Sequence, residues 1–284
     1  VIEPYAFYEC RGLEEINMLD ESLLEEIGEY AFYNNLRLKG LKMPTTIKTI
    51  GAYAFNKCKY LAAFEILEDS KLEHIGEHAF ENAEALAAIY IPESVKFIGQ
   101  YAFSNCKSLK ILKMSEDGLI EKIEDFTFQY TSIEEIIIPK TVETIGAFAF
   151  YMCEELNNII IPEKSNLEII KNSAFAGAKI TELIIPSSVK IIEEKAFQSC
   201  EMLKTINVEE NSKLQTLGKE VFSYCVRLKT ITLPKSLKEI GPNIFFYCQN
   251  IKDIVYLGTK EDWNMMKIEA PNDNINEDII SFLQ

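Results

Sequence analysis

The stretch IPESVKFIGQYAFSNCKSL, residues 91–109, decides the fold because most of its letters recur elsewhere in the chain. Close copies are TIGAYAFNKCKYL at 49–61, TIGAFAFYMCEEL at 144–156 and EIGPNIFFYCQNI at 239–251. Self-similarity with a period of roughly 20 to 50 residues is typical of proteins built from stacked units. A unit this short cannot bury its own apolar face, so stacked units share one continuous core. We therefore predict a solenoid.

One phenylalanine per unit, here called the anchor, marks the period. The anchors are Phe7, Phe32, Phe55, Phe80, Phe103, Phe128, Phe150, Phe175, Phe197, Phe222 and Phe245. Their separations alternate between 25 residues and 22 or 23 residues. We therefore predict about eleven coils over residues 1–257, the first one truncated, with a double repeat as the basic unit. In the shorter separations a proline ends the strand, at Pro44, Pro92, Pro139, Pro186 and Pro234; proline suits this place because it cannot donate to a sheet ladder.

Each unit divides into two segments. In the strand near Leu228, Ile231 and Leu233 alternate with Thr230 and Thr232, as in a half-buried β-strand. The second segment carries apolar residues at roughly helical spacing, at Ile98, Ala102, Cys106 and Leu109. We therefore expect an α/β solenoid whose second segment is a short helix or 3-10 turn. A recurrent glycine four residues before the anchor, and an alanine directly before it, predict close approach of neighbouring backbones.

Composition and charge exclude several functions. The 284 residues carry a formal net charge of −15, which would repel nucleic acid and anionic membranes. No apolar run is long enough to span a bilayer. No signal peptide is visible, and the first residues, VIEPYAF, already match the middle of a repeat, so we expect the chain to begin inside a larger protein. Nucleophile, phosphate-loop and redox motifs are absent, and we expect neither an enzyme nor a cofactor.

The frame L-x-x-I-x-I-P-x-S-V-K-x-I-G-x-x-A-F-x-x-C resembles the leucine-rich repeats of the BspA-like family, most closely over residues 91–109 and 228–248. The resemblance extends from about residue 2 to 257, with Glu124, Lys171 and Glu193 replacing the glycine. It implies a right-handed superhelix with a parallel β-sheet on its concave face and the short helical segments on its convex face. It also implies a bacterial protein that is exported, either secreted or located at the cell surface, with adhesin-like binding to host or bacterial surface proteins.

The end of the repeats also resembles this family. Residues 256–263, YLGTKEDW, are similar to the Y-x-G-T-x-x-x-W ending that follows its last repeat. An open solenoid exposes core and sheet edge at its last coil. We therefore predict that residues 258–284, with the single tryptophan Trp263, form a C-terminal cap. The N-terminal coil has no such cap, and we expect it to be exposed and to permit weak self-association or crystal contacts.

The cysteines and histidines offer little chemistry. All seven cysteines lie three residues after an anchor, in a position otherwise filled by small residues, and we expect buried free thiols. Disulfides are disfavoured because thiols in successive coils point in parallel. His74 and His78 have a metal-compatible spacing on a helix, but no third ligand is evident. We therefore predict no metal site.

Two sets of residues could form a binding surface. An aromatic slot two residues before the anchor contains Tyr5, Tyr30, Tyr53, Tyr101, Phe126 and Phe148, with His78 in the same series. We expect a convex ladder that packs neighbouring coils, and a stacking surface for a glycan or partner chain is the alternative. On the concave face, outward strand positions are mostly small or polar. The exceptions form our candidate binding patch: Tyr90, Ile111, Ile137, Ile160 and Ile184.

The patch supports two hypotheses of different classes. Contiguous exposed apolar side chains often mark an interaction site, which favours a non-enzymatic module that binds a protein or glycan ligand. Strand propensity alone would also place isoleucine on a pleated surface. The second hypothesis is therefore a structural spacer that projects another domain from the cell surface and binds no ligand of its own.

Overall fold

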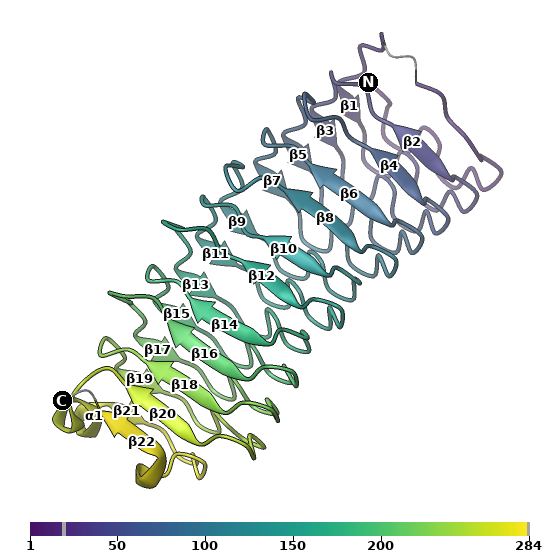
Figure 1. Cartoon of the computed structure of the whole chain (residues 1–284). Coiled ribbons are helices and arrows are strands. Elements are labelled where there is room, and N and C mark those ends of the chain that lie inside the picture. The colour runs from purple at the N-terminus through teal and green to yellow at the C-terminus, as the bar shows by residue number, and fades with distance from the viewer. Residues whose placement is uncertain (19–20, 283–284) are drawn as a thin grey trace.

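The computed structural model describes residues 1–18 and 21–282 as a parallel β-solenoid (Figure 1). From Glu26 onward each coil carries one strand of two residues and one longer strand. The two-residue strands form the short-strand face: β1 (Glu26–Ile27), β3 (Thr49–Ile50), β5 (His74–Ile75), β7 (Phe97–Ile98), β9 (Lys122–Ile123), β11 (Thr144–Ile145), β13 (Ile169–Ile170), β15 (Ile191–Ile192), β17 (Thr216–Leu217), β19 (Glu239–Ile240) and β21 (Lys267–Ile268).

The strands of three or four residues form the long-strand face, on which we predicted the binding patch. They are β2 (Gly40–Lys42), β4 (Ala63–Glu65), β6 (Ala88–Ile91), β8 (Ile111–Met114), β10 (Glu135–Ile137), β12 (Asn158–Ile160), β14 (Glu182–Ile185), β16 (Thr205–Val208), β18 (Thr230–Leu233), β20 (Asp253–Tyr256) and β22 (Ile280–Phe282). All strand pairs within the described residues are parallel and join neighbouring coils.

The predicted helical or 3-10 segment beside the anchor is absent from the described coils, and the α/β class was wrong in this respect. The segment consists of successive turns in which the residues two before and two after the anchor have left-handed backbone, as at Tyr30 (φ 55°) and Asn34 (φ 58°). Its N–H groups bond the next coil: Tyr30 N donates to Ala52 O at 2.9 Å and Phe32 N to Ala54 O at 2.8 Å. A helix would direct these donors along its own axis, so the apolar spacing reflects stacked turns instead.

In the described part of the chain, helical structure occurs only after the last repeat. It comprises α1 (Lys260–Met265) and the 3-10 helix η1 (Glu277–Ile279). Neither has the length and apolar content that crossing a membrane requires.

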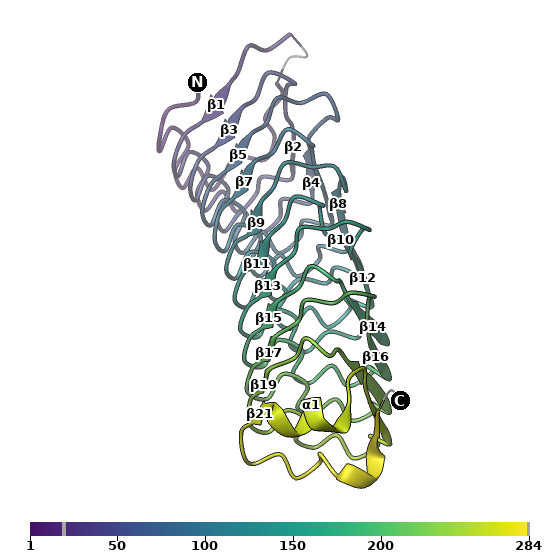
Figure 2. The ribbon, with the colours of Figure 1, turned by 90° about the vertical axis from the view of Figure 1, so that its left-hand side faces the viewer.

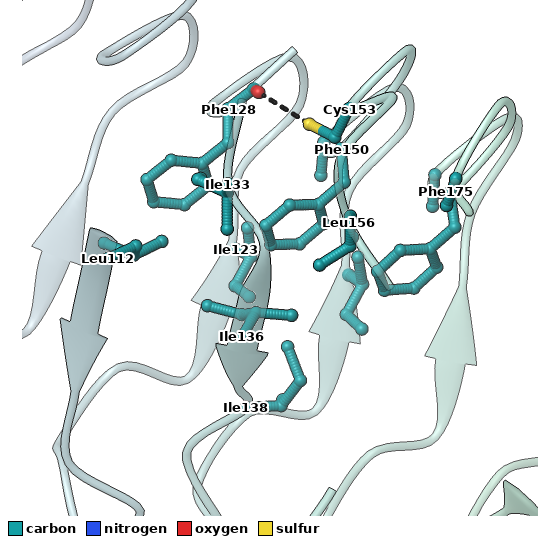
Figure 3. Close-up of a cluster of buried hydrophobic side chains, with 14 of the residues drawn as sticks. Leu112, Ile123, Phe128, Ile133, Ile136, Ile138, Phe150, Cys153, Leu156 and Phe175 are labelled. Carbon is teal, nitrogen blue, oxygen red and sulfur yellow. Dashed lines mark hydrogen bonds between the residues drawn. The ribbon is translucent and has the colours of Figure 1, made fainter. Parts of the chain in front are cut away.

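The anchors form the centre of the core. From Phe32 to Phe245 each anchor is at most 1% exposed. Successive rings are stacked with centroids 5.0 to 6.1 Å apart, within the range favoured by offset aromatic pairs. Figure 3 shows three of these rings, Phe128, Phe150 and Phe175, in one row above the inward residues of the strands. This stack of anchor rings runs through every coil and does not depend on which strands pair by backbone hydrogen bonds.

The recurrent glycine reflects close packing of backbones, as predicted. A Cβ on Gly76 would lie 2.4 Å from the backbone nitrogen of Ala52, and a Cβ on Gly99 would lie 2.5 Å from that of Glu77. Contacts this short leave no space for a side chain, so these coils require glycine there.

The long-strand face is interrupted at regular places. Strands pair within each double repeat, as β2–β4, β6–β8, β10–β12, β14–β16 and β18–β20. We call the boundary between two such pairs a join. Within the described residues no ladder crosses the joins β4/β6, β8/β10 and β12/β14, and only two residue pairs cross β16/β18. The predicted double repeat therefore has a structural counterpart.

Each join coincides with a proline. In a double repeat, Glu209 N donates to Ile185 O at 3.0 Å and Leu257 N donates to Leu233 O at 2.9 Å, just after the paired strands. At a join the corresponding residue is a proline, at Pro92, Pro139, Pro186 and Pro234. Proline has no N–H to donate, so each join lacks this hydrogen bond. Pro162 occupies the same position within the pair β10–β12, which forms its ladder without that bond.

One join coincides with a change in the direction of the stack. The short-strand face is also interrupted between β7 and β9, in the same coils as the β8/β10 join. Figure 2 shows that the row of short strands changes direction there. The molecule is therefore least regular near residues 111–123.

The C-terminal segment continues both faces. Strand β21 pairs with β19 and β22 pairs with β20. Thr259 caps α1 through a capping box with Asp262, and the buried Trp263 ring meets Tyr256 edge-on at 5.2 Å. A Cβ on Gly258 would lie 2.6 Å from the Tyr256 ring. The Y-x-G-T-x-x-x-W residues thus form one packed corner, and the boundary at residue 257 and the cap assignment stay predictions.

Candidate functional site

All five residues of the candidate patch lie on the outward side of the long-strand face. Their strands alternate buried and outward residues, as in β8 and β14, where exposed and buried side chains follow each other strictly. Ile184 is 59% exposed, Ile111 53% and Ile160 36%, whereas Tyr90 and Ile137 are half-buried. The structure thus places the patch at the surface, and its role in binding stays a prediction.

The patch residues are distributed over several strand pairs and across the joins between them. Tyr90 lies in β6, directly beside Lys113 of β8, and Ile137 lies directly beside Ile160 of β12. Lys113 therefore lies between Tyr90 and Ile137 in this row of outward residues, whereas Ile111 lies beside Ala88 in the other row. Ile184, in β14, follows across the β12/β14 join. Most outward residues beyond this point are polar, as at Asn207 and Thr232, whereas Val255 in β20 is apolar.

An apolar hollow lies at the β4/β6 join. It has a volume of about 350 Å³ and includes Phe64, Ile66 and Ile89, which are core side chains, with Tyr90 and Ile111 among its outward residues. No backbone hydrogen bond joins residues 63–67 to 88–92 in the described chain. Because β4 and β6 do not pair there, solvent reaches the outer side of the core through the gap between these two strands.

A second and more polar hollow lies at the β8/β10 join, with a volume of about 530 Å³. Buried Leu112 and Met114 line it together with Tyr90, Lys113 and Ile137. Figure 3 shows Leu112 and Ile136 on neighbouring strands separated by this join. Among described residues, no backbone hydrogen bond joins 111–115 to 135–139. Both hollows therefore follow from the missing ladder, and Tyr90 and Lys113 line both.

Acidic side chains dominate the second hollow. Glu68, Glu93 and Glu135 line it, and Lys113 is the one cation among its described lining residues. Two of these carboxylates are held in place, because Ser115 Oγ donates to Glu93 at 2.8 Å and Asn158 Nδ2 donates to Glu135 at 2.6 Å. Partial burial raises the pKa of Tyr90, with smaller contributions from the nearby carboxylates Glu68 and Glu93. The hollow therefore has a negative potential.

Residue-by-residue reading of the outward positions missed this hollow. Glu68 and Glu93 lie in turns and Ser115 directly follows β8, outside the two rows from which the patch was chosen. The prolines after β6, β10, β14 and β18 were the available signal, although Pro162 after β12 lies within a strand pair.

The predicted aromatic ladder is present. Tyr5, Tyr30, Tyr53, His78, Tyr101, Phe126 and Phe148 are stacked in that order, with ring centroids 4.5 to 5.1 Å apart. Tyr5 is 55% exposed, whereas the others are half-buried between neighbouring coils. Burial raises the pKa of Tyr30 and of Tyr53. These contacts favour a packing role, and use of the ladder as a binding surface stays a prediction.

The cysteines are free thiols, and six of them are buried, as expected; Cys10, in the first coil, is exposed. Each buried thiol donates to the carbonyl oxygen of the preceding anchor of its stack, as from Cys153 to Phe128 at 3.1 Å (Figure 3). Burial raises the pKa of Cys153 to about 11 and those of Cys58 and Cys200 to about 12. Buried thiols of high pKa are poor nucleophiles and poor metal ligands.

The two histidines are not brought together as ligands. His78 stacks between Tyr53 and Tyr101 and lies 2.9 Å from Glu81 through Nδ1. His74 stacks on Phe97 of the short-strand face. Residues 1–18 and 21–282 contain no group of three or more metal-ligating side chains.

The first coil is open on one side. Phe7 is 38% exposed, whereas the next anchor, Phe32, is fully buried. Tyr8 beside it is 42% exposed, although it stacks on Tyr33 at 5.1 Å. The expected self-association through this coil stays a prediction.

Comparisons with solved structures return other repeat proteins. A leucine-rich cell surface protein of Faecalibacterium prausnitzii is 22% identical, with 95% of this chain and 86% of that chain covered and a TM-score of 0.49. A leucine-rich repeat protein of Bacteroides ovatus is 26% identical, with 100% and 88% covered and a TM-score of 0.41. The pneumococcal vaccine antigen PcpA is 20% identical, with 78% and 72% covered and a TM-score of 0.47. No curated protein matches.

The family model for the BspA type leucine-rich repeat region matches six copies, over residues 1–110 and 121–252. The unmatched residues between them contain β8 and the turn that follows it, at the irregular part of the stack. The match covers most of the chain and confirms the resemblance drawn from its repeats. The chain therefore belongs to the BspA type leucine-rich repeat family.

Proposed function

We propose that this protein is a non-enzymatic protein-interaction module of an exported or cell-surface bacterial protein, with adhesin-like binding through its long-strand face. Repeat families of this kind are generally scaffolds that present an extended surface. One observation carries the proposal: among the described strands, the stretch of this face with outward isoleucines in three successive strands adjoins the stretch with hollows at its joins.

The remaining outward surface supports this choice of site. Strands β16 and β18 present Thr205, Asn207, Thr230 and Thr232, and β20 continues the rows with Asp253 and Val255. Apart from Val255 these side chains are polar, and the sheet that carries them has no open join, so they offer a ligand little apolar contact and no hollow. Aliphatic side chains beside hollows that reach the core offer a ligand both apolar contact and a concave surface, which is typical of protein interfaces.

The direct test replaces three isoleucines. Ile137→Thr, Ile160→Thr and Ile184→Thr together keep β-branched residues on the strands and remove the apolar strip. Binding to a panel of immobilised purified extracellular-matrix and plasma proteins should fall at least about tenfold for any ligand of the wild type. The matched control is Asn207→Ala, Thr232→Ala and Val255→Thr, which changes the same row three strands further along. Equal loss in the control, or no loss in the isoleucine variant, would refute the proposed site.

A spacer without a ligand is the second candidate. The unbroken stack of anchor rings favours it, because a core continuous through all joins makes a stiff rod. A spacer would bind no member of the panel, and the isoleucine variant would then behave as the wild type in every assay, including its own self-association.

A further inference from the structure

We infer that the two hollows beside Tyr90 together receive an extended peptide segment that carries one basic and one apolar side chain. The inference rests on the proposed function and names the chemistry of its partner. It starts from strands β6 and β8, which pair with each other but, within the described residues, with neither neighbour, so that one hollow flanks them on each side.

The hollows differ in chemistry. The one at β4/β6 has core side chains as its floor, Phe64, Ile66 and Ile89, and fits an aliphatic or aromatic side chain. The one at β8/β10 is lined by three carboxylates against a single ammonium among the described residues. A cationic side chain complements that charge, and a chain of net charge −15 also attracts a cation over a longer range.

The acidic hollow has the features of an ordered site. Ser115 and Asn158 hold Glu93 and Glu135 by hydrogen bonds. A guanidinium could therefore meet oriented carboxylates without the entropy cost of ordering both. Tyr90, half-buried between the hollows, offers its ring to the segment that crosses it.

Strand spacing sets the separation of the two side chains. Neighbouring strands lie about 4.8 Å apart, so the centres of two joins separated by one strand pair lie about 10 Å apart. A polyproline-type segment rises about 3.1 Å per residue with about three residues per turn. Residues three apart then point to the same side at about 9 Å, which matches the two hollows.

The test uses a blocked peptide, GSLPPRSG, in which leucine and arginine are three residues apart. Isoleucine methyl resonances of the full chain report the position, because Ile89, Ile111 and Ile137 line the hollows. We expect these three to shift on titration. Replacing arginine by glutamate in the peptide should weaken binding at least about tenfold, because it removes the charge attraction. Raising the salt concentration from a low value to about 0.5 M should weaken binding to a similar extent, because salt screens the same attraction.

Variants of the protein give the second readout. Glu68→Gln, Glu93→Gln and Glu135→Gln together keep the shape and one acceptor oxygen per side chain and remove the negative charges. They should weaken the binding of GSLPPRSG about tenfold. Glu182→Gln, an outward carboxylate of β14 away from the hollows, is the control and should leave binding unchanged. An unchanged melting transition in each variant establishes that the fold is intact.

Three outcomes would overturn the inference. These are no shift of the three methyl groups, equal binding of the glutamate peptide, and stronger shifts with a neutral oligosaccharide such as maltopentaose, which would assign the hollows to a glycan. The proposed function fails separately. If the three-glutamine variant binds a matrix protein as the wild type does while the three-threonine variant does not, the interaction role stands and the basic peptide is excluded.

Discussion

The long-strand face is discontinuous from β4 to β14 and continuous from β14 to β22, although the same repeat builds both regions. In the discontinuous region, pairs of strands are separated by open joins. In the continuous region five strands form one sheet, and the β16/β18 join is bridged by Thr205 beside Thr230 and Ile206 beside Ile231. Proline follows the strand at every join in both regions, so proline alone does not account for the difference.

Outward residues differ between the two regions. Threonine faces threonine across β16/β18, and such β-branched pairs stabilise a sheet by roughly 0.2 to 1 kcal/mol each. At the open joins the outward residues meeting across the gap include Ala63 opposite Ala88 and Lys113 opposite Ile137, which make weaker pairs. At the β12/β14 join, however, Ile160 and Ile184 occupy the corresponding outward positions and no ladder forms, so the outward pairs do not account for every open join. The two hollows lie at the open joins β4/β6 and β8/β10.

The largest effect is expected from a test of whether the core is equally stable in the two regions. Phe128→Ala, next to the β8/β10 join, and Phe222→Ala, in the continuous region, should each cost about 3 to 5 kcal/mol, because each removes a buried ring from the same stack. Urea unfolding with hydrogen exchange by segment is the measurement, since a stack of repeats need not unfold in one step.

Phe128→Leu and Phe222→Leu are the controls, and they should recover some of the loss because leucine fills much of the cavity. A cost at Phe128 well below that at Phe222 would show that the open joins loosen the core as well as the sheet.

Much of this core was predictable from the sequence. The period located every anchor, and the position of the cysteines beside them predicted buried thiols. The turns were not predictable, because a helix and stacked left-handed turns place apolar residues at similar spacing. Asparagine two residues after the anchor, at Asn34, Asn82 and Asn105, favours left-handed backbone. Glu9, Lys57 and Met152 occupy the same place in other coils, however, and hide that signal.

The candidate site was predictable to a smaller extent. Alternation along each strand identifies outward residues such as Tyr90 and Ile184. A hollow depends on a hydrogen bond that is missing between neighbouring coils, and on which outward residues face each other. These are properties of two neighbouring coils, so the sequence of a single coil does not predict where a hollow forms.

Alkaline pH tests the thiols in both regions. Burial raises the pKa of Cys153, in the discontinuous region, to about 11 and that of Cys200, in the continuous region, to about 12, from the ordinary 9.0. A thiol with a raised folded-state pKa stabilises the fold fully below about pH 9, and this contribution is lost as pH rises toward the folded-state value. The free energy of unfolding should fall above about pH 9, by up to about 1.4 kcal/mol per pH unit for each buried thiol.

Cys153→Ala and Cys200→Ala should each reduce the slope of unfolding free energy against pH between about pH 9 and 11 by about one thiol's share. Exposed Cys10 is the control, and Cys10→Ala should leave that slope unchanged. A slope insensitive to all three changes would exclude the buried thiols as its cause.

Close backbone packing provides a smaller test within the discontinuous region. Gly76→Ala should cost about 1 to 3 kcal/mol, because the added Cβ would lie 2.4 Å from the Ala52 nitrogen. Lys171 occupies the corresponding place in another coil and is half-buried, so Lys171→Ala should change stability by no more than about 0.5 kcal/mol. Thermal melting measures both, and equal effects would mean that coil spacing adjusts freely.

The smallest expected effect is on amide hydrogen exchange, which directly probes the missing backbone hydrogen bonds at the joins. A backbone hydrogen bond contributes roughly 1 kcal/mol net, which corresponds to about fivefold in an opening equilibrium. Amides of β8 and β10 that face their join should therefore exchange at least about fivefold faster than amides bonded between β18 and β20, which share four residue pairs. Strands β10 and β12 share three residue pairs, so amides bonded across that pair should be protected like those of β18 and β20. If fast exchange instead covers β10 and β12 alike, the central coils as a whole are loose and the β8/β10 join is not their specific weak point.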